Sequence, residues 1–349
     1  MTHHYLILAN PGHNRVYFEQ SAALSLAELE VALSGFASVC GNIEEKTISG
    51  ISYISFTADR PLPPEDLRRL SRLSFVYAVF EERILDSSLC LLPVTVPNIA
   101  YVRPEVSRIL KYTGKTNELF TRLVINVALN SGAYADEAAP RLLDPVAGRG
   151  TTLFEALVCG CHASGIEIGD KVAGDTAAYF KRFLETEKYK HTYHKERLSG
   201  TNRSFTSMIH SFVLAPSKEA WAAEDTRELQ LVAGNARHAD AFFRKNSFHA
   251  LVGDLPYGVQ HGNVTQEKQS SLTRNPKELL KTCLPAWRKV LKPGAALVLA
   301  WNTLIFPREE MTALLTQQGF EVKNGGPYDR FVHRVDQSIR RDIVAAIKR

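Results

Sequence analysis

The chain has 349 residues and a net charge of +5, with 45% hydrophobic and 23% charged residues, a composition ordinary for a soluble globular protein of about two domains. No apolar run approaches the roughly 20 residues of a membrane span, and the first residues lack the basic and apolar regions of a secretory signal. The five cysteines are an odd count without framework spacing, which argues against a disulfide-stapled secreted protein and favours a cytoplasmic location.

The first ninety residues alternate strand-like and helical patterns. Residues 51–56 alternate with period two, and 20–33 carry apolar residues at helical spacing. The pattern predicts strands at 5–8, 51–56 and 75–80 and helices at 20–33 and 63–73. We therefore expect a small ferredoxin-like α+β domain over 1–90. A linker follows over 91–114, with three prolines between 92 and 104.

From residue 115 to 349 the pattern becomes strand followed by helix, which predicts a doubly wound, Rossmann-like parallel sheet. The expected strands are 141–144, 163–167, 230–233, 250–254 and 295–301, with a helix at 151–158 and a turn at 292–294. The second and third strands are separated by far more residues than a usual crossover. We interpret about 175–228 as a basic insertion, because Lys181 to His210 holds seven Lys/Arg against three Glu.

A glycine-containing turn follows the first strand of this region. Asp144-Pro145-Val146-Ala147-Gly148-Arg149-Gly150-Thr151 joins a strand to a helix, where the glycines allow a ligand to approach and the helix offers free N–H groups. A strand-tip acid suits the positive charges of S-adenosylmethionine better than a pyrophosphate. An ordinary tight turn is the alternative for the glycines taken alone.

Two further strand ends complete a predicted cofactor site. Glu167 ends the second strand at the spacing of an acid that binds a ribose diol. Asn235 follows the third strand, where its side-chain oxygen could accept from an adenine amino group, with Asp240 as a rival for that role. The full set of predicted cofactor-binding residues is Asp144, Pro145, Ala147, Gly148, Gly150, Thr151, Glu167, Ile168, Asn235, Ala236 and Asp254.

The predicted reaction centre is Asp254-Leu255-Pro256-Tyr257, which follows the fourth strand. A base amine is a poor nucleophile because its lone pair is delocalised. The Asp254 carboxylate and the Leu255 carbonyl could hold its hydrogens, Pro256 could stiffen the loop and Tyr257 could stack on the base. Asp254 could then take the released proton. In isolation the same string could be a turn.

These residues carry a family resemblance. The segment from 115 to 340 resembles class I methyltransferases with an (Asp/Asn/Ser)-Pro-Pro-(Tyr/Phe/Trp) motif, and Asp254-Leu255-Pro256-Tyr257-Gly258 looks most like the THUMP-associated tRNA guanosine-N2 methyltransferases. The resemblance implies a class I methyltransferase domain behind a ferredoxin-like and THUMP-like region, which is here reduced to residues 1–90. It also implies S-adenosylmethionine as cofactor and N2-methylation of a guanosine in tRNA. Leu255 replaces the first proline of the commoner motif, and Asn235 replaces the usual acid.

RNA contacts are expected from the basic insertion. The candidates are Lys188, Lys190, Lys195, Arg197 and Arg203, interleaved with aromatic residues, although a solvated helix face with a loop would look the same. Arg330, His333, Arg334, Arg340 and Arg341 could add phosphate contacts or form a paired surface network. No histidine and cysteine spacing completes a metal site.

Two alternative functions stay open from the sequence. One is a DNA methyltransferase acting on adenine N6 or cytosine N4, which uses the same motif chemistry. The other is an RNA-binding protein whose methyltransferase fold is inactive. The sequence does not determine the target nucleotide, mono- versus dimethylation, the oligomeric state, or the need for a small activating subunit.

Overall fold

The structure is a computed structural model that describes residues 2–10, 15–108, 115–200, 205–257 and 276–349. These residues divide into two compact units. The first contains residues 1–99 and 324–335, and the second contains residues 100–323 and 336–349. Within the described ranges, no helix combines the length and the apolar character needed to cross a bilayer.

The first unit is an antiparallel sheet with two helices. Its elements in chain order are β1 (His3–Ala9), α1 (Arg15–Leu33), β2 (Cys40–Ile48), β3 (Ile51–Ala58), α2 (Pro64–Arg72), β4 (Val76–Leu85) and β5 (Ser88–Val94). The sheet order is β2-β3-β1-β4-β5. The βαββαβ order with β1 between β3 and β4 confirms the predicted ferredoxin-like domain, to which β5 adds an edge strand.

Two strands of this unit were absent from the sequence-based prediction. β2 contains Glu44, Glu45 and Lys46 and has no buried residue, and its sequence lacks a clear apolar alternation. β5 begins before the predicted linker and ends inside it, and the short helix α3 (Glu105–Arg108) also falls within 91–114. The core of the unit contains a stacked pair, Tyr5 and Phe56, whose ring centroids are 5.3 Å apart.

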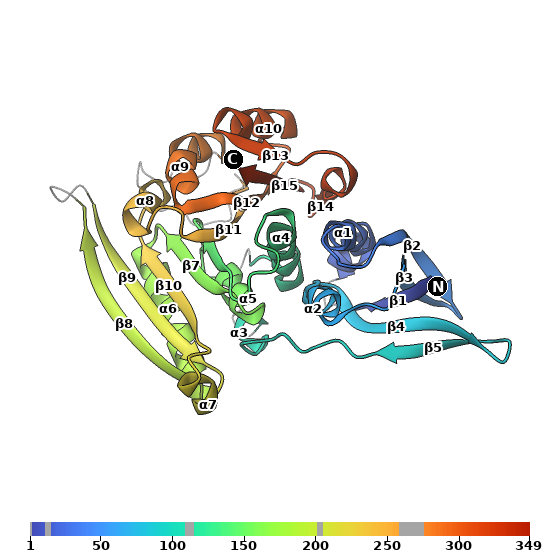
Figure 1. Cartoon of the computed structure of the whole chain (residues 1–349). Helices are drawn as coiled ribbons and strands as arrows, with labels where there is room; N and C mark the ends of the chain where they lie inside the picture. The colour runs from blue at the N-terminus through green and yellow to red at the C-terminus, as the bar shows by residue number, and fades with distance from the viewer. Residues whose placement is uncertain (1, 11–14, 109–114, 201–204, 258–275) are drawn as a thin grey trace. The chain divides into compact units, whose positions relative to one another are not determined.

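The second unit is built on a mixed sheet of order β13-β15-β12-β11-β6-β7-β10-β9-β8 (Figure 1). Its strands are β6 (Arg141–Asp144), β7 (His162–Glu167), β8 (Lys190–Ser199), β9 (Thr206–Ala215), β10 (Arg227–Ala233), β11 (Phe248–Asp254), β12 (Leu291–Asn302), β13 (Phe320–Val322) and β15 (Arg340–Lys348). The five strands β10, β7, β6, β11 and β12 are mutually parallel. The predicted doubly wound, Rossmann-like parallel sheet is confirmed.

Helices cover both faces of this sheet (Figure 1). The helices of the unit, besides α3, are α4 (Glu118–Ser131), α5 (Thr151–Val158), α6 (Asp170–Thr186), α7 (Lys218–Ala222), α8 (Ala239–Phe242), α9 (Pro276–Val290) and α10 (Arg308–Gln317). One apolar core lies between the sheet and α8, α9 and α10, where Trp287 and Trp301 are fully buried. On the other face α4 and α5 contact each other and the central strands.

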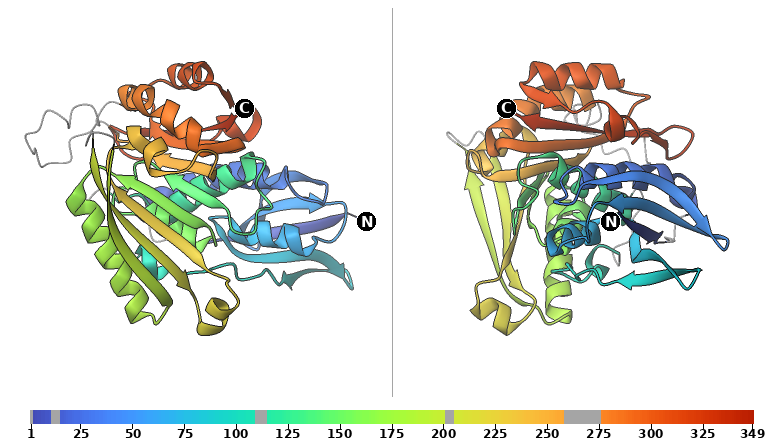
Figure 2. Two further views of the ribbon diagram at one scale, coloured as in Figure 1. Left: turned by 60° about the vertical axis from the view of Figure 1, so that its left-hand side comes forward. Right: turned by 45° about the vertical axis from the view of Figure 1, so that its right-hand side comes forward.

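The segment predicted as a basic insertion is regular structure. It contains α6, the β8–β9 hairpin and α7, and the hairpin extends the sheet beyond β10 (Figure 2). The predicted turn at 292–294 is wrong, because these residues lie inside β12. Gly294 has a φ of +76°, and the pairing of β11 with β12 shifts register between Phe248 and Ala250, so the strand continues through an irregularity.

Candidate active site

Three acidic side chains stand at the carboxyl ends of neighbouring parallel strands. Asp144 ends β6, Glu167 ends β7 and Asp254 ends β11. In an open parallel sheet this edge is where ligands bind. The acids are close enough to interact, since both Asp254 and Glu167 raise the pKa of Asp144. The topology therefore gathers the predicted cofactor and reaction residues at one edge.

The glycine turn between β6 and α5 requires glycine at two positions. Gly148 has a φ of +51° and Gly150, the N-cap of α5, has a φ of +82°, a region that side chains rarely adopt. A Cβ at Gly150 would stand 3.0 Å from Thr176 Cγ2, whereas one at Gly148 would meet nothing within 4 Å. The backbone is thus open at Gly148 and packed at Gly150. Ala147 and Thr151 are buried beside them, and Pro145 precedes the turn.

Asp144 is a buried carboxylate with an unusual titration. It is 2% exposed, and its Oδ1 accepts a hydrogen bond from the Val146 N–H at 2.9 Å. Burial, with smaller contributions from Asp254 and Glu167, raises its pKa to about 7, although bonds from Val146 and Thr152 act in the opposite direction. The charged form of Asp144 is therefore disfavoured until a positive charge is placed beside it.

The Glu167 carboxylate accepts hydrogen bonds from backbone N–H groups of two turns. Its Oε1 accepts from the Gly169 N–H at 2.8 Å, and the Gly148 N–H also bonds to its carboxylate. Burial raises its pKa despite these bonds and despite the nearby positive charge of Arg149. The contact with Gly148 ties the end of β7 to the glycine turn, so both sides of the predicted cofactor site share one hydrogen-bonded frame.

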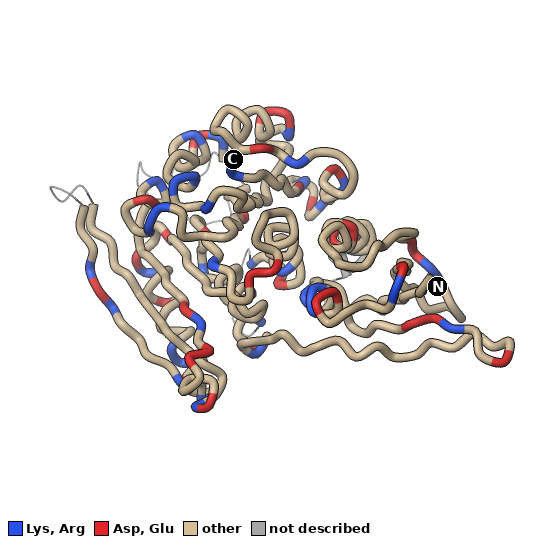
Figure 3. The backbone as a smooth tube through the Cα atoms, viewed as in Figure 1, with Lys and Arg blue, Asp and Glu red and all other residues tan. Residues whose placement is uncertain are grey.

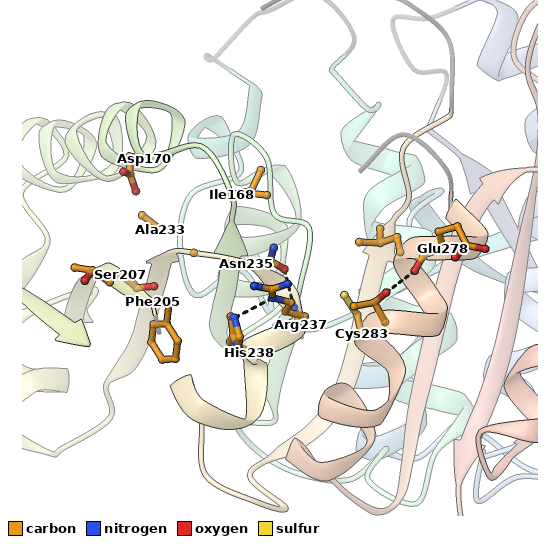
Figure 4. A pocket seen from close by; sticks show the side chains of 14 residues that line it. Ile168, Asp170, Phe205, Ser207, Ala233, Asn235, Arg237, His238, Glu278 and Cys283 are labelled. Atoms are coloured by element: carbon orange, nitrogen blue, oxygen red, sulfur yellow. Dashed lines mark hydrogen bonds between the residues drawn. The ribbon is translucent and has the colours of Figure 1, made fainter. Parts of the chain in front are cut away.

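A cavity of about 430 Å³ lies beyond the ends of β7 and β10. Figure 4 shows Phe205 and His238 on one side and Glu278 and Cys283 on the other, with Ile168, Asn235 and Arg237 between them. Ile168 is 51% exposed, an unusual state for an isoleucine that the cavity explains. The volume and mixed lining suit the adenosine part of a nucleotide-like ligand.

Asn235 lines this cavity, but its side chain already has a structural role. Its Oδ1 accepts from the Arg237 N–H at 3.1 Å and caps the short helix η2 (Ala236–His238). A carbonyl oxygen has a second lone pair, so one acceptor position is left for a ligand. Asp240 does not line the cavity; it pairs with Lys289 at 2.7 Å. Ala236 is buried below, and its carbonyl accepts from Trp287 Nε1.

Sequence reasoning missed the wall that the hairpin adds to the cavity. Phe205 stacks on His238 with centroids 4.8 Å apart, and Phe242 meets Phe205 edge-on. Phe205 lies 38 residues beyond Glu167, and no spacing rule connects it with the end of β10. The hairpin brings it there because β9 pairs with β10 along its length.

At the predicted reaction centre, both oxygens of Asp254 accept hydrogen bonds from hydroxyl groups. Thr116, a residue that the sequence did not single out, donates to Oδ2 at 2.5 Å, and Tyr257 donates to Oδ1. Burial and the Asp254 carboxylate raise the pKa of Tyr257 well above its usual value, so the phenol stays protonated. Leu255 is buried, and its N–H donates to the Ala300 carbonyl at 2.9 Å, which fixes the loop to β12. Pro256 follows it.

Arg341 also belongs to this centre, although the sequence suggested a surface phosphate contact. Only 7% of it is exposed, so that suggestion is wrong for this residue. Its guanidinium lies 4.3 Å from the Phe120 ring centroid and 4.9 Å from that of Tyr257. Of the other candidates near the C-terminus, Arg330 pairs with Glu30.

The predicted RNA-binding residues lie along the hairpin and do not form one cluster. On β8 an acidic residue, Glu196, stands between Lys195 and Arg197, and Figure 3 shows the charges of this strand. Lys190 Nζ lies 5.8 Å from the Trp221 ring, whereas Lys195 lies near His210 and lowers its pKa together with burial. Arg197 is exposed further along the strand, and Lys188 precedes it with a φ of +59°. Arg203 lies outside the described residues. In the part of the chain that the structure describes, no group of three His, Cys, Asp or Glu could hold a metal.

Comparison with known proteins gives structural matches only. No protein-family model and no curated protein matches the sequence. TrmN from Thermus thermophilus matches over all of both chains at 11% identity, with a TM-score of 0.42. The T. thermophilus 16S rRNA N2 G1207 methyltransferase RsmC, solved with AdoMet and guanosine, matches 88% of this chain and 58% of its own at 13% identity and a TM-score of 0.36. The magnesium protoporphyrin IX methyltransferase of Synechocystis, solved with SAM, matches 70% and 90% at 12% identity and a TM-score of 0.38.

Proposed function

We propose that the chain is an S-adenosylmethionine-dependent methyltransferase that acts on an amino group of a nucleic-acid base. The observation that carries this proposal is the group of three carboxylates, Asp144, Glu167 and Asp254, at the edge that holds the glycine turn. Burial, together with repulsion among these acids, raises the pKa of Asp144 to about 7. A cationic ligand relieves that repulsion, whereas a dinucleotide pyrophosphate would add to it.

The described residues fit this cofactor. The open backbone at Gly148 leaves space for a ligand, and the cavity of about 430 Å³ offers apolar and polar contacts for an adenosine group. In this assignment Asp144 and the turn Pro145, Ala147, Gly148, Gly150 and Thr151 surround the methionine end. Glu167 takes the ribose hydroxyls, and Ile168, Asn235 and Ala236 surround the adenine.

When bound, S-adenosylmethionine supplies an electrophilic methyl group. In this proposal Asp254 and the Leu255 carbonyl accept the two hydrogens of a base amine, which frees its lone pair for attack. The amine displaces one of the hydroxyl donors that Asp254 holds in this structure, Thr116 or Tyr257. Asp254 then accepts the proton that the methylated nitrogen loses, and the ring of Tyr257 is available to stack on the base.

For the substrate we propose RNA, and more narrowly guanosine N2 in tRNA. The support is the resemblance of Asp254-Leu255-Pro256-Tyr257 to the tRNA guanosine-N2 motif, since guanine N2 is an exocyclic amine that this loop can hold. A paired base is out of reach, so the nucleotide must be presented unstacked. DNA adenine N6 and cytosine N4 are amines of the same kind and form the alternative.

Methyl transfer to defined nucleic acids tests the proposal. The protein is incubated with labelled S-adenosylmethionine and, separately, unmodified tRNA, ribosomal RNA or duplex DNA, and the nucleosides are identified by mass spectrometry. We expect N2-methylguanosine from tRNA only. Methyladenosine or methylcytosine from DNA would move the substrate to the alternative. Cofactor binding without transfer to any substrate would support an inactive, RNA-binding protein.

The hairpin gives a separate test of RNA contact. Replacing Lys190, Lys195 and Arg197 together by Glu should weaken tRNA binding and lower the slope of log affinity against log salt by about 0.7–0.9 for each phosphate that is no longer neutralised. Binding is measured by fluorescence anisotropy at several salt concentrations. The control variant replaces Lys323, Lys277 and Lys281 by Glu, and these residues lie outside the hairpin in the same unit. Equal effects of both sets would show a non-specific charge effect and remove the hairpin from RNA binding.

A further inference from the structure

Arg341 is a buried cation beside the proposed reaction centre. It belongs to β15, where it is paired with Asn302 of β12, and only 7% of it is exposed. Its guanidinium lies between two aromatic rings, with Phe120 of α4 at 4.3 Å and Tyr257 at 4.9 Å. Burying a guanidinium is costly unless other groups compensate for its hydration. The compensating groups must therefore be found among its neighbours.

The contacts of Arg341 connect it to Asp254, and not to the acid that follows it in the sequence. Asp342, the next residue, pairs with Arg308 at 2.6 Å. Among the described residues, Arg341 forms no ion pair with a carboxylate, and its Nε is buried without a hydrogen-bond partner. It does bond to the Tyr257 hydroxyl. Tyr257 in turn donates to Asp254 Oδ1. The positive charge is thus connected to the acid of the proposed reaction through one phenol.

Two contacts restrain Tyr257, one at its ring and one at its main chain. Arg341 covers the ring from one direction, and Asn302 Nδ2 donates to the Tyr257 carbonyl at 3.5 Å from the neighbouring strand. A ring covered by a cation on one face can stack a base only on the other. The order Phe120, Arg341, Tyr257, base then follows.

We propose that Arg341 is a positioning residue that sets the orientation of Tyr257, and through it the hydrogen bonding of Asp254, for methyl transfer. This inference rests on the proposed function. Arg341 does not contact the substrate: it acts through Tyr257. Lysine can keep the charge at this position, but it lacks the planar fork that lies between two rings and bonds to the phenol.

Kinetics of three variants test the inference. Arg341→Met should lower kcat for the methylated RNA about 10- to 30-fold, as expected for loss of a desolvated cation–π interaction, while calorimetric affinity for S-adenosylmethionine stays near wild type. Arg341→Lys should keep part of the rate. Arg349→Met is the matched control, because Arg349 is exposed, directly follows the same strand and pairs with Glu321, and it should leave kcat unchanged.

A double-mutant cycle separates positioning from a general structural role. If Arg341 acts through Tyr257, then Arg341→Met in a Tyr257→Ala background should lower the remaining rate by less than about twofold. Multiplicative losses in the double variant would overturn the inference. Wild-type kcat in Arg341→Met would overturn it as well.

A spectroscopic measurement does not depend on the substrate. In protein labelled with ¹³C at tyrosine Cζ, the Tyr257 resonance is assigned by its loss in Tyr257→Phe. Arg341→Met should shift this resonance, and Arg349→Met should not. If Arg341→Met does not fold, Arg341→Lys takes its place and should give a smaller shift. An unmoved resonance overturns the inference. A wild-type protein that methylates no nucleic acid overturns the proposed function, while the resonance still decides whether Arg341 orients Tyr257.

Discussion

The two edges of the parallel sheet in the second unit carry titratable side chains of opposite type. At the carboxyl edge stand the acids Asp144, Glu167 and Asp254. At the amino edge His162 begins β7 and His249 is the second residue of β11. Burial shifts pKa values at both edges, upward for Asp144 to about 7 and downward for His162 to about 4. Both shifts disfavour the charged form, so titration alone does not distinguish a functional site from a structural one.

The two edges differ in whether their buried titratable groups already have hydrogen-bond or ion-pair partners within the protein. His249 Nδ1 accepts from the Arg141 N–H at 2.8 Å, its Nε2 lies 3.7 Å from a Glu137 carboxylate oxygen, and His162 Nδ1 accepts from the Glu228 N–H at 3.1 Å. Neutral imidazoles meet donors there. Within the described ranges, by contrast, Asp144 and Asp254 form no ion pair with a cationic side chain. The buried histidines of the amino edge thus have partners within the protein, whereas the proposed partner of the two aspartates at the carboxyl edge is a cationic ligand.

The largest effect should follow loss of Asp254. Asp254→Ala removes the acceptor of the amine hydrogens and of the released proton, so kcat should fall by about 10²–10⁴-fold. Cofactor affinity, measured by calorimetry, should stay near wild type. Glu228→Ala, which removes a carboxylate from the amino edge, is the control and should retain activity. Turnover retained in Asp254→Ala would exclude Asp254 from the reaction.

Glu167 should affect binding and not the chemical step. Glu167→Ala removes a carboxylate from the proposed ribose site, and the loss of charged hydrogen bonds should weaken cofactor binding by about 10- to 100-fold. At saturating cofactor, kcat should recover. Glu167→Gln keeps the size and one acceptor and should have a smaller effect. An affinity equal to wild type in both variants would exclude the ribose contact.

Asp144 should give cofactor binding a pH dependence. A cation binds the ionised form of Asp144, whose pKa is about 7 in this structure. Affinity should therefore fall about tenfold for each pH unit below 7, and it should level off above that value. Calorimetry between about pH 5.5 and 8.5 covers this range. Asp144→Asn should bind weakly and without the slope, and a slope that persists in Asp144→Asn would assign it to another group.

The same residue should lower the stability of the ligand-free protein. Its pKa rises from 3.8 in the unfolded chain to about 7 when folded, so the stability that it contributes is complete below pH 3.8 and is lost as pH rises through about 7. At about pH 8, above both values, Asp144→Asn should melt at a higher temperature than wild type, and saturating cofactor should reduce the difference.

The sequence predicted the parallel strands well because their physical signal is local. Strands β6 and β11 are largely apolar and each ends with an acid. Gly148 and Gly150 mark the turn that follows β6. The carboxyl-edge rule then brings Asp144, Glu167 and Asp254 together without knowledge of any side-chain contact. The apolar run 5–8 within β1 and the alternation of β3 are equally local signals.

Long-range packing could not be predicted in the same way. The edge strand β8 carries charged residues and lacks an apolar alternation, so its sequence is equally typical of a loop or an exposed helix face. Phe205 reaches the cavity only because β9 pairs with β10. Arg341 stands in a run of surface-like arginines, and its burial depends on Phe120 and Tyr257, which are far away in sequence. Thr116 likewise meets Asp254 across 138 residues.

The smallest effect should come from a substitution at the amino edge, His162→Asn, which tests the contrast with Asp144. Asn can place its side-chain oxygen where His162 Nδ1 accepts from Glu228, but Asn does not titrate. His162 has an ordinary pKa of 6.5 and a folded pKa of about 4. Its contribution to stability is therefore present above pH 6.5 and is lost as pH falls through 4, the reverse of Asp144.

His162→Asn should leave the rate of methyl transfer unchanged. Between pH 6.5 and 4 its melting temperature should fall by less than that of the wild type. Thermal melts at matched ionic strength measure this difference, and Asp144→Asn melts in the same series should show the opposite trend at higher pH. A loss of kcat in His162→Asn would mean that the amino edge is coupled to the reaction. His162, a neutral imidazole that already accepts a hydrogen bond, would then affect the reaction as Asp144 is expected to do. The contrast drawn between the amino edge and the carboxyl edge would no longer hold.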